Sequence, residues 1–434
     1  MVRHSILCTV RALALVIIFA ATSAGDLHGQ VTVVHVSTAP IKAAVTSKEP
    51  AAEAAPRVAC PESSAPVGLH RPVLPETSGP AVASFVDPTV RIDTPERVTI
   101  KCRSYVGPFA SLDASQGPIF LGEGSNVQDN ALITGRLVVL GDNVIIAHGA
   151  TIKGPSTIGS GKGRPAFVGF NAFVDGAVIE DDAMVGVLAR VAPGIVIRSG
   201  RKVLPGKFVR TQGEADSVAL GKIAEVTEAD RKFMEGVLHV NVAFARGYTG
   251  LYQSAPGQVR GVARDPGESD FNPDADLPSL GGQPQSKPEF NARIIGKVAM
   301  ANSSEELARL LGANVAIRAD EGEGFTFGRL TSVQDRVTFH ALEHTTMQIG
   351  DRVRVGFHAV VHGGEDSGNT PHETTRVGDD VAVGDWAVVF RSTIGKGSTI
   401  GIRALVDGSQ LAPGTIVPDR AIIIDNKRVG TVEW

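Results

Sequence analysis

A six-residue period runs through most of this 434-residue chain and constrains its fold more than any other feature. Branched apolar side chains recur at Leu140, Ile146, Ile152 and Ile158, and the small residue Ala150 stands four positions after Ile146. Helices repeat every 3.6 residues and half-buried strands every two, so neither produces this spacing. A hexapeptide period is typical of a parallel β-helix, in which six residues form one flat side and three sides close a coil.

The period occurs in two separate stretches, which predicts two domains of the same kind. The first stretch continues through Val168 and Val174. The second stretch contains Phe327, Val333, Phe339, Ile349, Val355, Val361, Val377, Val383, Val389, Ile394 and Ile400. We therefore expect a mainly β protein built from two parallel β-helices. Abundant glycine (49 residues) and few aromatic residues (5%) agree with many short strands and tight turns.

The domain boundaries follow from where the period begins and stops. We predict a signal peptide at 1–24, an Ala/Pro-rich linker at 25–84, a first β-helix domain at 85–252, a second linker at 253–298 and a second β-helix domain at 299–434. A long α-helix at 227–252 should close the first domain, and it has no counterpart in the second. Shorter helices are expected at 214–223 and at 304–311.

Two of these predicted helices, at 227–252 and at 304–311, carry recognisable sequence signals. Apolar residues at Phe233, Val237, Val240 and Phe244 form a stripe on the long helix, which would be buried against the first β-helix. Ser303 is followed three residues later by Glu306, the spacing of a capping box at the start of the 304–311 helix.

The N-terminal segment has the composition of a secretory signal. Arg3 and Arg11 are positively charged, residues 12–21 form an apolar core, and residues 22–24 are small enough for cleavage. The core is too short to span a bilayer comfortably. We therefore expect an exported protein, periplasmic or extracellular, without a membrane span. Cys60 and Cys102 remain after cleavage, and both a disulfide and two free buried thiols stay open.

Charge excludes one class of partner. The net charge is −4 and charged residues make up 20% of the chain, so there is no basic footprint for nucleic acid.

Two histidines of the second domain occupy equivalent positions. Counting hexads places His340 and His362 on the same side of neighbouring coils, where strands lie about 4.8 Å apart. Two imidazoles at that separation can bind one cation, but a catalytic zinc site normally has three protein ligands and an open position for water. His358 falls on a different side of the coil, so the pair alone is an incomplete site.

Several segments resemble the gamma-class carbonic anhydrases. They are RADEG, SVQDRVTFHALE and the HGG after VGFHAVV in the second half, and SNVQD, IIAHGATIKGP and LHVNVAFARGY in the first half. The resemblance covers roughly 85–252 and 313–418. It implies left-handed β-helices in a trimeric arrangement, a metal site between neighbours, and reversible hydration of carbon dioxide to bicarbonate by a lyase, carbonate dehydratase.

The resemblance distributes the family's metal ligands unevenly between the two domains. The stacked histidine pair corresponds to His340 and His362 in the second domain, but to Thr134 and Lys153 in the first. The third ligand comes from a neighbouring β-helix in that family.

The third ligand position shows the opposite distribution. It falls on His148 in the first domain and on Phe357 in the second. We therefore hypothesise one composite site made of His148, His340 and His362. Two alternatives stay open: both sites have decayed and His148 is an accidental surface histidine, or the site uses His358 or His372.

Further site residues are implied by the resemblance alone. Glu321 matches a carboxylate beside the metal and its solvent, and Glu343 matches a proton shuttle. Gln334 matches a glutamine that orients the hydroxide nucleophile, and Asn241 matches an active-site asparagine on the long helix.

Arg318 and Asp320 match residues that form ion pairs across the interface between β-helices. The cofactor implied is Zn²⁺, although Fe²⁺ or Co²⁺ fits the same ligands. The expected partners are carbon dioxide and bicarbonate, together with other β-helices in a homo-oligomer or hetero-oligomer. Two other functions stay in view: a metal-free structural or interaction protein on the same scaffold, and a hexapeptide-repeat acyltransferase.

Overall fold

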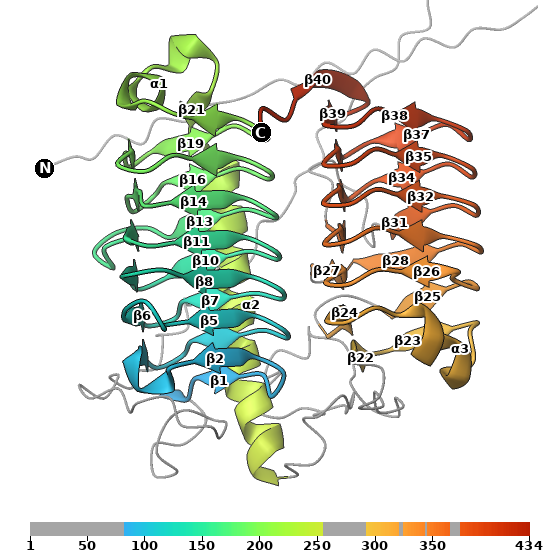
Figure 1. The fold of residues 1–434 in the computed structure, drawn as a ribbon, viewed down its shortest axis with the longest axis horizontal. Helices are drawn as coiled ribbons and strands as arrows, with labels where there is room; N and C mark the ends of the chain where they lie inside the picture. The colour runs from blue at the N-terminus through green and yellow to red at the C-terminus, as the bar shows by residue number, and fades with distance from the viewer. Residues whose placement is uncertain (1–81, 255–291, 321–323, 343–344, 365–373) are drawn as a thin grey trace, which may run out of the picture. The chain divides into compact units, whose positions relative to one another are not determined.

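Triangular coils of short parallel strands are stacked into two β-helices (Figure 1). The computed structural model describes residues 82–254, 292–320, 324–342, 345–364 and 374–434. The predicted fold class is confirmed: the protein is mainly β and contains two left-handed parallel β-helices. The predicted signal peptide and most of the two linkers lie outside the described residues.

β-helix 1 has three sheets, which we call 1A, 1B and 1C. Sheet 1A contains β1 (Phe85–Val86), β4 (Tyr105–Val106), β7 (Asn126–Val127), β10 (Val144–Ile146), β13 (Ala166–Val168), β16 (Met184–Val185), β19 (Arg201–Val203) and the antiparallel β21 (Ile223–Glu225). Sheet 1B contains β2 (Arg91–Asp93), β5 (Ser111–Asp113), β8 (Leu132–Thr134), β11 (Thr151–Lys153), β14 (Phe173–Asp175), β17 (Arg190–Val191) and β20 (Phe208–Val209). Sheet 1C contains β3 (Val98–Ile100), β6 (Ile119–Leu121), β9 (Val138–Leu140), β12 (Ser156–Ile158), β15 (Val178–Ile179) and β18 (Val196–Ile197).

β-helix 2 repeats this arrangement in sheets 2A, 2B and 2C. Sheet 2A contains β26 (Ser332–Val333), β29 (Arg354–Val355), β32 (Ala382–Val383), β35 (Thr399–Ile400) and β38 (Ile416–Val417). Sheet 2B contains β22 (Ala292–Gly296), β24 (Val315–Ala319), β27 (Thr338–Ala341), β30 (Val360–Gly363), β33 (Val388–Phe390), β36 (Leu405–Asp407), β39 (Ala421–Ile424) and the antiparallel β40 (Lys427–Thr431). Sheet 2C contains β23 (Val298–Met300), β25 (Phe325–Phe327), β28 (Thr346–Ile349), β31 (Thr374–Val377), β34 (Thr393–Ile394) and β37 (Gln410–Leu411).

The hexad residues fill the interior of each coil stack. Leu140, Ile146 and Ile152 are at most 1% exposed, and Ile152 pairs in register with Ile133 and Val174 on the neighbouring coils. Burying a side chain of this size contributes about 1.5–3 kcal/mol to stability. Because every coil adds three such residues, the six-residue period itself specifies the register of the stack.

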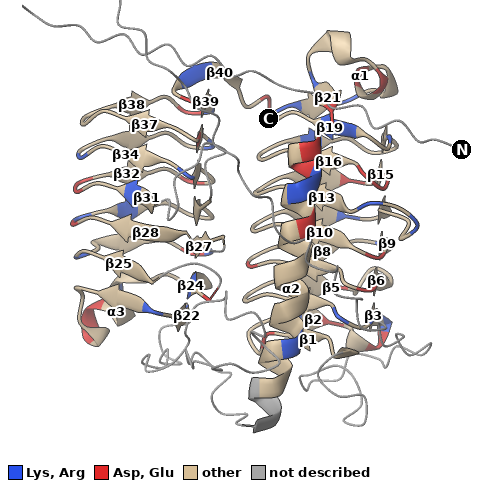
Figure 2. Ribbon diagram, turned by 180° about the vertical axis from the view of Figure 1, so that it is seen from behind, with Lys and Arg blue, Asp and Glu red and all other residues tan. Residues whose placement is uncertain are grey.

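The long helix α2 (Glu228–Ser254) packs along sheet 1A, as its apolar stripe predicts. Val240 and Phe244 are buried against strands β1 and β4, and the Phe244 ring lies 5.4 Å from that of Tyr105. Most of the charged residues of α2 stand in its N-terminal half, and Arg246 is the one charged residue in the turns that carry Phe244 and Tyr248 (Figure 2). Within the described residues, no helix combines the length and apolar character needed to cross a membrane.

Two predicted boundaries are wrong. Residues 214–223 do not form one helix: α1 (Gln212–Asp216) is followed by a 3₁₀ turn and by β21. Gly221 adopts a left-handed conformation (φ 69°), which ends the 3₁₀ turn and directs the chain into β21. The second β-helix already includes Ala292–Gly296, before the predicted start at 299, because β22 pairs with β24 over five residues. Its short apolar run directly follows a Pro- and Gly-rich stretch, which concealed it.

Two smaller predictions have definite outcomes. The helix α3 (Ser304–Leu310) starts with the predicted capping box, in which the Ser303 hydroxyl accepts from the Glu306 N–H and the Glu306 carboxylate accepts from the Ser303 N–H. Cys102 is disulfide-bonded, and Cys60 lies outside the described residues.

Both β-helices belong to one compact unit, and apolar side chains join them. Val360, Val388 and Leu405 of sheet 2B share a buried cluster with Phe170 and Leu188 of β-helix 1. Phe170 and Leu188 stand in what we call the A–B corner, the turn that leads from each strand of sheet A to the next strand of sheet B. The face of one β-helix therefore packs on a corner of the other.

Buried ion pairs cross this interface. The Arg318 guanidinium, which is 1% exposed, donates from Nη1 to Asp129 Oδ1 at 2.8 Å and from Nε to Asp320 Oδ2 at 3.0 Å. A second pair joins Arg293 Nη2 to Asp87 Oδ2 at 2.9 Å. Ion pairs buried this deeply need good geometry, because each charge has lost its water and depends on its partner.

His358 belongs to the same interface, not to a separate ligand set. Its Nδ1 lies 3.1 Å from Asn171 Oδ1, while the Asn171 amide donates to the His358 carbonyl at 3.0 Å. The ring stacks on Trp386 with centroids 4.0 Å apart. Burial and the nearby Arg336 lower the pKa of His358 to about 4. His358 is therefore neutral near pH 7 and connects the two corners.

The C-terminal arm also contacts β-helix 1. The Trp434 indole donates from Nε1 to the Leu188 carbonyl at 2.6 Å. Glu433 lies within 3.3 Å of Lys207 Nζ and 3.2 Å of Lys222 Nζ.

Replacing Arg318 by Met should lower the free energy of unfolding by about 3–5 kcal/mol, because two buried carboxylates lose their shared counter-ion. Arg352→Met is the matched control, since Arg352 pairs with Asp380 at 2.6 Å but is 53% exposed. That control should cost less than about 1 kcal/mol. Urea denaturation of the metal-free protein measures both losses, and equal losses would contradict the burial argument.

The pKa of His358 predicts a pH effect on stability. Below the ordinary pKa of about 6.5 the unfolded chain protonates this imidazole, whereas the folded protein does not until about pH 4. The contribution of His358 to the free energy of unfolding should therefore fall by about 1.4 kcal/mol per pH unit as pH decreases through this window, about 3 kcal/mol in all. His358→Gln keeps a polar partner for Asn171 and should remove this contribution, while the slope that comes from the buried His340 and His362 remains. Parallel stability–pH curves for the two proteins would refute the assignment.

Candidate metal centre

The three predicted ligand histidines come from adjacent elements of the two β-helices. His340 in β27 and His362 in β30 pair directly across the coils, as hexad counting predicts. His148 follows β10 in the A–B corner of β-helix 1. All three side chains are buried, at 1–3% exposure. A surface location for His148, one of the alternatives left open by the sequence, is therefore wrong.

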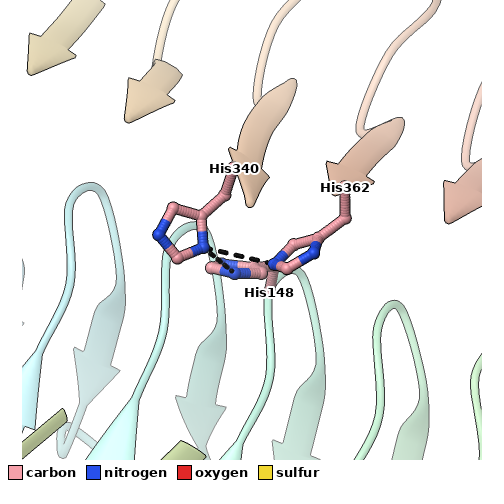
Figure 3. Close-up of side chains that lie close together, drawn as sticks. All are labelled: His148, His340 and His362. Carbon is pink, nitrogen blue, oxygen red and sulfur yellow. Dashed lines mark hydrogen bonds between the residues drawn. The ribbon is translucent and has the colours of Figure 1, made fainter. Parts of the chain in front are cut away.

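The three rings point toward one another (Figure 3). His340 Nδ1 lies 3.2 Å from His148 Nε2 and 3.2 Å from His362 Nε2. All three nitrogens lie within 4.8 Å of one another. Two ligands of a tetrahedral zinc, each bound at about 2.05 Å, stand about 3.3 Å apart. The two separations from His340 Nδ1 therefore match the ligand spacing of a metal of this size.

Each histidine has an acceptor beside its outer nitrogen. His148 Nδ1 is 3.3 Å from Asp129 Oδ2, His340 Nε2 is 3.4 Å from Asp320 Oδ1, and His362 Nδ1 is 2.5 Å from the Gly363 carbonyl oxygen. An acceptor at the outer nitrogen favours a proton there and leaves the inner nitrogen with its lone pair. Three inward lone pairs cannot hydrogen-bond to one another, so this arrangement calls for a cation.

Arg318 holds both of the carboxylates that face the histidines. Burial opposes ionisation of Asp129, but Arg318 outweighs that effect and lowers the pKa of the Asp129 carboxyl below its ordinary value. The same balance brings the pKa of Asp320 well below its ordinary value. Both acids are consequently anionic near neutral pH, and both can accept from an imidazole.

His340 and His362 themselves resist protonation. Burial and the Arg318 guanidinium lower the pKa of His340 to about 4. Burial, together with His340 and His148, lowers the pKa of His362 well below its ordinary value. A metal binds only the neutral imidazole, so these ligands stay competent in mild acid.

Two phenylalanines form a wall of the centre that sequence reasoning missed. Phe170 stacks on His362 at 4.8 Å and on His148 at 5.5 Å, and Phe390 meets His362 edge to face at 5.6 Å. They occupy the positions of His148 and His362 one coil further along. The hexad count could have identified them by that register.

Tyr248 links α2 to the centre. Its hydroxyl donates a hydrogen bond to Asp320, and burial followed by Asp320 raises the pKa of Tyr248 well above its ordinary value. A neutral phenol at this place keeps Asp320 fixed beside His340. Sequence reasoning did not include Tyr248, because the contact joins residues 72 positions apart.

The other predicted site residues have different outcomes. Glu321 and Glu343 lie outside the described residues, and so does His372. Asn241 is buried on α2, where its amide donates to the Val237 carbonyl at 2.8 Å.

Gln334 is not brought to the histidines. It is exposed in the A–B corner of β-helix 2, which carries Phe357 one coil further along. Its counterpart Gln128, buried directly before Asp129, stands in the corner that carries His148. In the composite arrangement, the buried glutamine therefore lies on the same β-helix as His148. The prediction of Gln334 assumed that the glutamine comes from the same domain as His340 and His362. His358, an alternative ligand, faces Asn171 instead of this centre.

No family model matches the chain. It is 32% identical over 208 residues to a carbonic anhydrase of Methanosarcina thermophila, covering 41% of this chain and 80% of that protein. It is 35% identical over 94 residues to the carnitine operon protein CaiE of Escherichia coli, covering 21% and 45%. It is 31% identical over 134 residues to the carboxysome assembly protein CcmM of Nostoc, covering 27% and 22%.

Among solved structures, a hexapeptide transferase family protein from Anaplasma phagocytophilum aligns with a TM-score of 0.30 and 24% identity, over 38% of this chain and 93% of that one. The match to the Methanosarcina protein is the informative one, because this chain covers four fifths of it at 32% identity. The chain belongs to the gamma-class carbonic anhydrase family.

Proposed function

We propose that the protein catalyses the metal-dependent, reversible hydration of carbon dioxide to bicarbonate at one composite centre. The observation that carries this proposal is the convergence of three buried imidazoles, His148 from β-helix 1 and His340 and His362 from β-helix 2. The metal we favour is Zn²⁺, since three buried histidines suit it, and Fe²⁺ or Co²⁺ fits the same donors. Bound there, a divalent cation acidifies water and so supplies a hydroxide nucleophile near neutral pH.

The chain's own residues would set the geometry of that chemistry. Asp129 and Asp320 lie 3.3 and 3.4 Å from the outer nitrogens of His148 and His340, which favours protons there and inner lone pairs directed at one point. Phe170 covers one side and excludes water, so charges within the centre interact more strongly.

We also propose that Glu321 and Glu343 carry protons outward. Gln334 or Gln128 would orient the nucleophile, and Asn241 would contribute to the site. A carboxylate relays a proton only within hydrogen-bond reach of its partner. Gln128 is the stronger candidate of the two glutamines because it is buried beside Asp129.

A second function is favoured by a specific observation. Two similar proteins are named for a carnitine operon and for carboxysome assembly, so members of this fold are not all described as enzymes. A metal-free structural or interaction protein is therefore the competing proposal. A hexapeptide-repeat acyltransferase has less support, because acyl transfer does not need three histidines arranged to bind a metal.

Metal content separates the two proposals. The purified protein, reconstituted with Zn²⁺, should bind one metal per chain by plasma mass spectrometry, because one histidine cluster is present in the described residues. His148→Ala and His362→Ala should each weaken binding at least about tenfold and abolish stopped-flow carbon dioxide hydration. His239→Ala is the control, since His239 is exposed on α2. Failure to bind Zn²⁺, Fe²⁺ or Co²⁺ would favour the metal-free protein.

Export is the remaining prediction. The signal sequence at 1–24 should direct the protein to the periplasm or the medium, and cleavage after Ala24 should leave a mature chain that begins at Gly25. Intact-mass spectrometry of the fractionated protein measures this start directly. An uncleaved chain in the cytoplasmic fraction would contradict it.

A further inference from the structure

The acceptors beside two of the ligand histidines are held without help from α2. His362 faces the carbonyl oxygen of Gly363, which is fixed by strand β30. His148 faces Asp129, and both oxygens of that carboxylate accept from Arg318 Nη1, at 2.8 and 3.0 Å. A backbone carbonyl and a carboxylate held on both oxygens have little freedom to turn. The orientation of these two imidazoles therefore follows from the two β-helices alone.

The acceptor beside His340 is held differently. Asp320 is fully buried, and its Oδ1 lies 3.4 Å from His340 Nε2. Arg318 Nε lies 3.2 Å from Oδ1 and 3.0 Å from Oδ2, so this donor bridges both oxygens without favouring either. The Tyr248 hydroxyl donates to Oδ2. The phenol therefore distinguishes the two oxygens and leaves Oδ1 directed at the histidine.

A carboxylate bridged by one donor is free to tilt. The terminal torsion of an aspartate is broad, so small rotations of its carboxylate cost little. A hydrogen bond to an ionised acceptor is among the strong ones in proteins, and a second such bond on one oxygen opposes rotation. Without the Tyr248 hydroxyl, Asp320 can turn away from His340, whose contact is already 3.4 Å long.

Tyr248 can fix this angle because its own ring is fixed. The side chain is 2% exposed. Its ring stacks on Phe85 at 5.3 Å and lies 6.0 Å from Tyr105 and 5.8 Å from Phe244. Phe85 and Tyr105 belong to strands β1 and β4, and Phe244 stands one turn earlier on α2. An aromatic side chain packed on three rings keeps one rotamer, which gives its hydroxyl one place.

The contact crosses from one β-helix to the other. Tyr248 belongs to α2, which packs on β-helix 1, whereas Asp320 follows β24 and His340 lies in β27 of β-helix 2. β-helix 1 therefore acts on the centre in two ways. It supplies His148 as a ligand, and through α2 it orients the acceptor of a ligand that belongs to β-helix 2.

The orientation of Asp320 matters because His340 has a competing tautomer. Its Nδ1 lies 3.2 Å from nitrogens of both His148 and His362, so a proton on Nδ1 could be donated to either of them. An imidazole protonated at Nδ1 cannot bind a cation there. An acceptor at Nε2 favours the other tautomer, which leaves the Nδ1 lone pair for the metal.

We propose that Tyr248 is a positioning residue of the metal centre, which holds Asp320 at the angle that keeps the proton of His340 on its outer nitrogen. This inference rests on the composite metal centre proposed above, and it adds that α2 sets the affinity of that centre for its cation. Loss of an outer partner of a ligating histidine weakens metal binding about 10–100-fold. Tyr248 acts through Asp320, so its hydroxyl should contribute the lower value, about tenfold.

Tyr248→Phe removes the hydroxyl and keeps the ring. Competition of the full chain with a zinc chelator should show an affinity for Zn²⁺ about tenfold lower than that of the wild type. Tyr105→Phe is the matched control: Tyr105 is 1% exposed in the same aromatic cluster, and no hydrogen bond within the described part of the chain joins its hydroxyl to Asp320. The control should bind Zn²⁺ like the wild type. Equal losses in both variants would assign the effect to packing of the cluster and overturn the proposal.

A double-mutant cycle tests whether Tyr248 acts through Asp320. In a chain that already carries Asp320→Ala, Tyr248→Phe should cause no further loss of Zn²⁺ affinity, because the hydroxyl no longer has a carboxylate to orient. An undiminished further loss would contradict the proposed route.

NMR of labelled histidine nitrogens in the metal-free chain gives a readout that does not depend on metal binding or on Asp320→Ala. The fraction of His340 that carries its proton on Nε2 should be lower in Tyr248→Phe than in the wild type, whereas Tyr105→Phe should leave it unchanged. A wild type that binds no Zn²⁺ would contradict the metal centre itself, and this comparison would still test Tyr248. An unchanged tautomer in Tyr248→Phe would overturn the proposal.

Discussion

A single buried guanidinium coordinates the interface and the metal centre. Arg318 reaches Asp129 on β-helix 1 and Asp320 on β-helix 2, and each of these carboxylates faces a different histidine of the cluster. The charge that pairs the two β-helices therefore also favours, in two imidazoles, the tautomer that can bind a cation. The same ion pairs therefore dock the two β-helices and orient the ligand histidines.

The division of the ligands between the repeats follows from this coupling. Sheet 2B carries His340 and His362, and the corner of β-helix 1 that packs against it carries His148. Sheet 1B carries Lys153 at the equivalent position, and the corner of β-helix 2 carries Phe357. Only the first combination is assembled inside the chain. Sheet 1B and the corner of β-helix 2 do not have to hold three nitrogens about 3 Å apart. They carry aromatic and arginine side chains instead.

Periodicity made the fold and much of the centre accessible from sequence. The six-residue spacing specifies register, so the pairing of His340 with His362 could be counted without coordinates. What the sequence left undetermined depends on long-range contact. The hydrogen bond of Tyr248 to Asp320 and the place of His358 between the corners carry no local signal. Strand β22 was concealed because five residues are too few to establish a period.

The helix near residue 214 was overextended for a local reason. Propensity over ten residues favoured a helix, but Gly221 adopts φ 69° and the chain then pairs backward with β19. A glycine in that conformation terminates a helix whatever its neighbours prefer. Tertiary pairing thus overrode a weak preference, whereas in the coils the pairing and the pattern agree.

Placing both halves of the centre on one chain changes how it responds to dilution. A cluster shared by separate subunits disassembles when their concentration falls below the dissociation constant. Here the second half is tethered to the first at an effective concentration on the order of millimolar, whatever the amount of protein present. The assembly of the centre is therefore independent of the concentration of the protein.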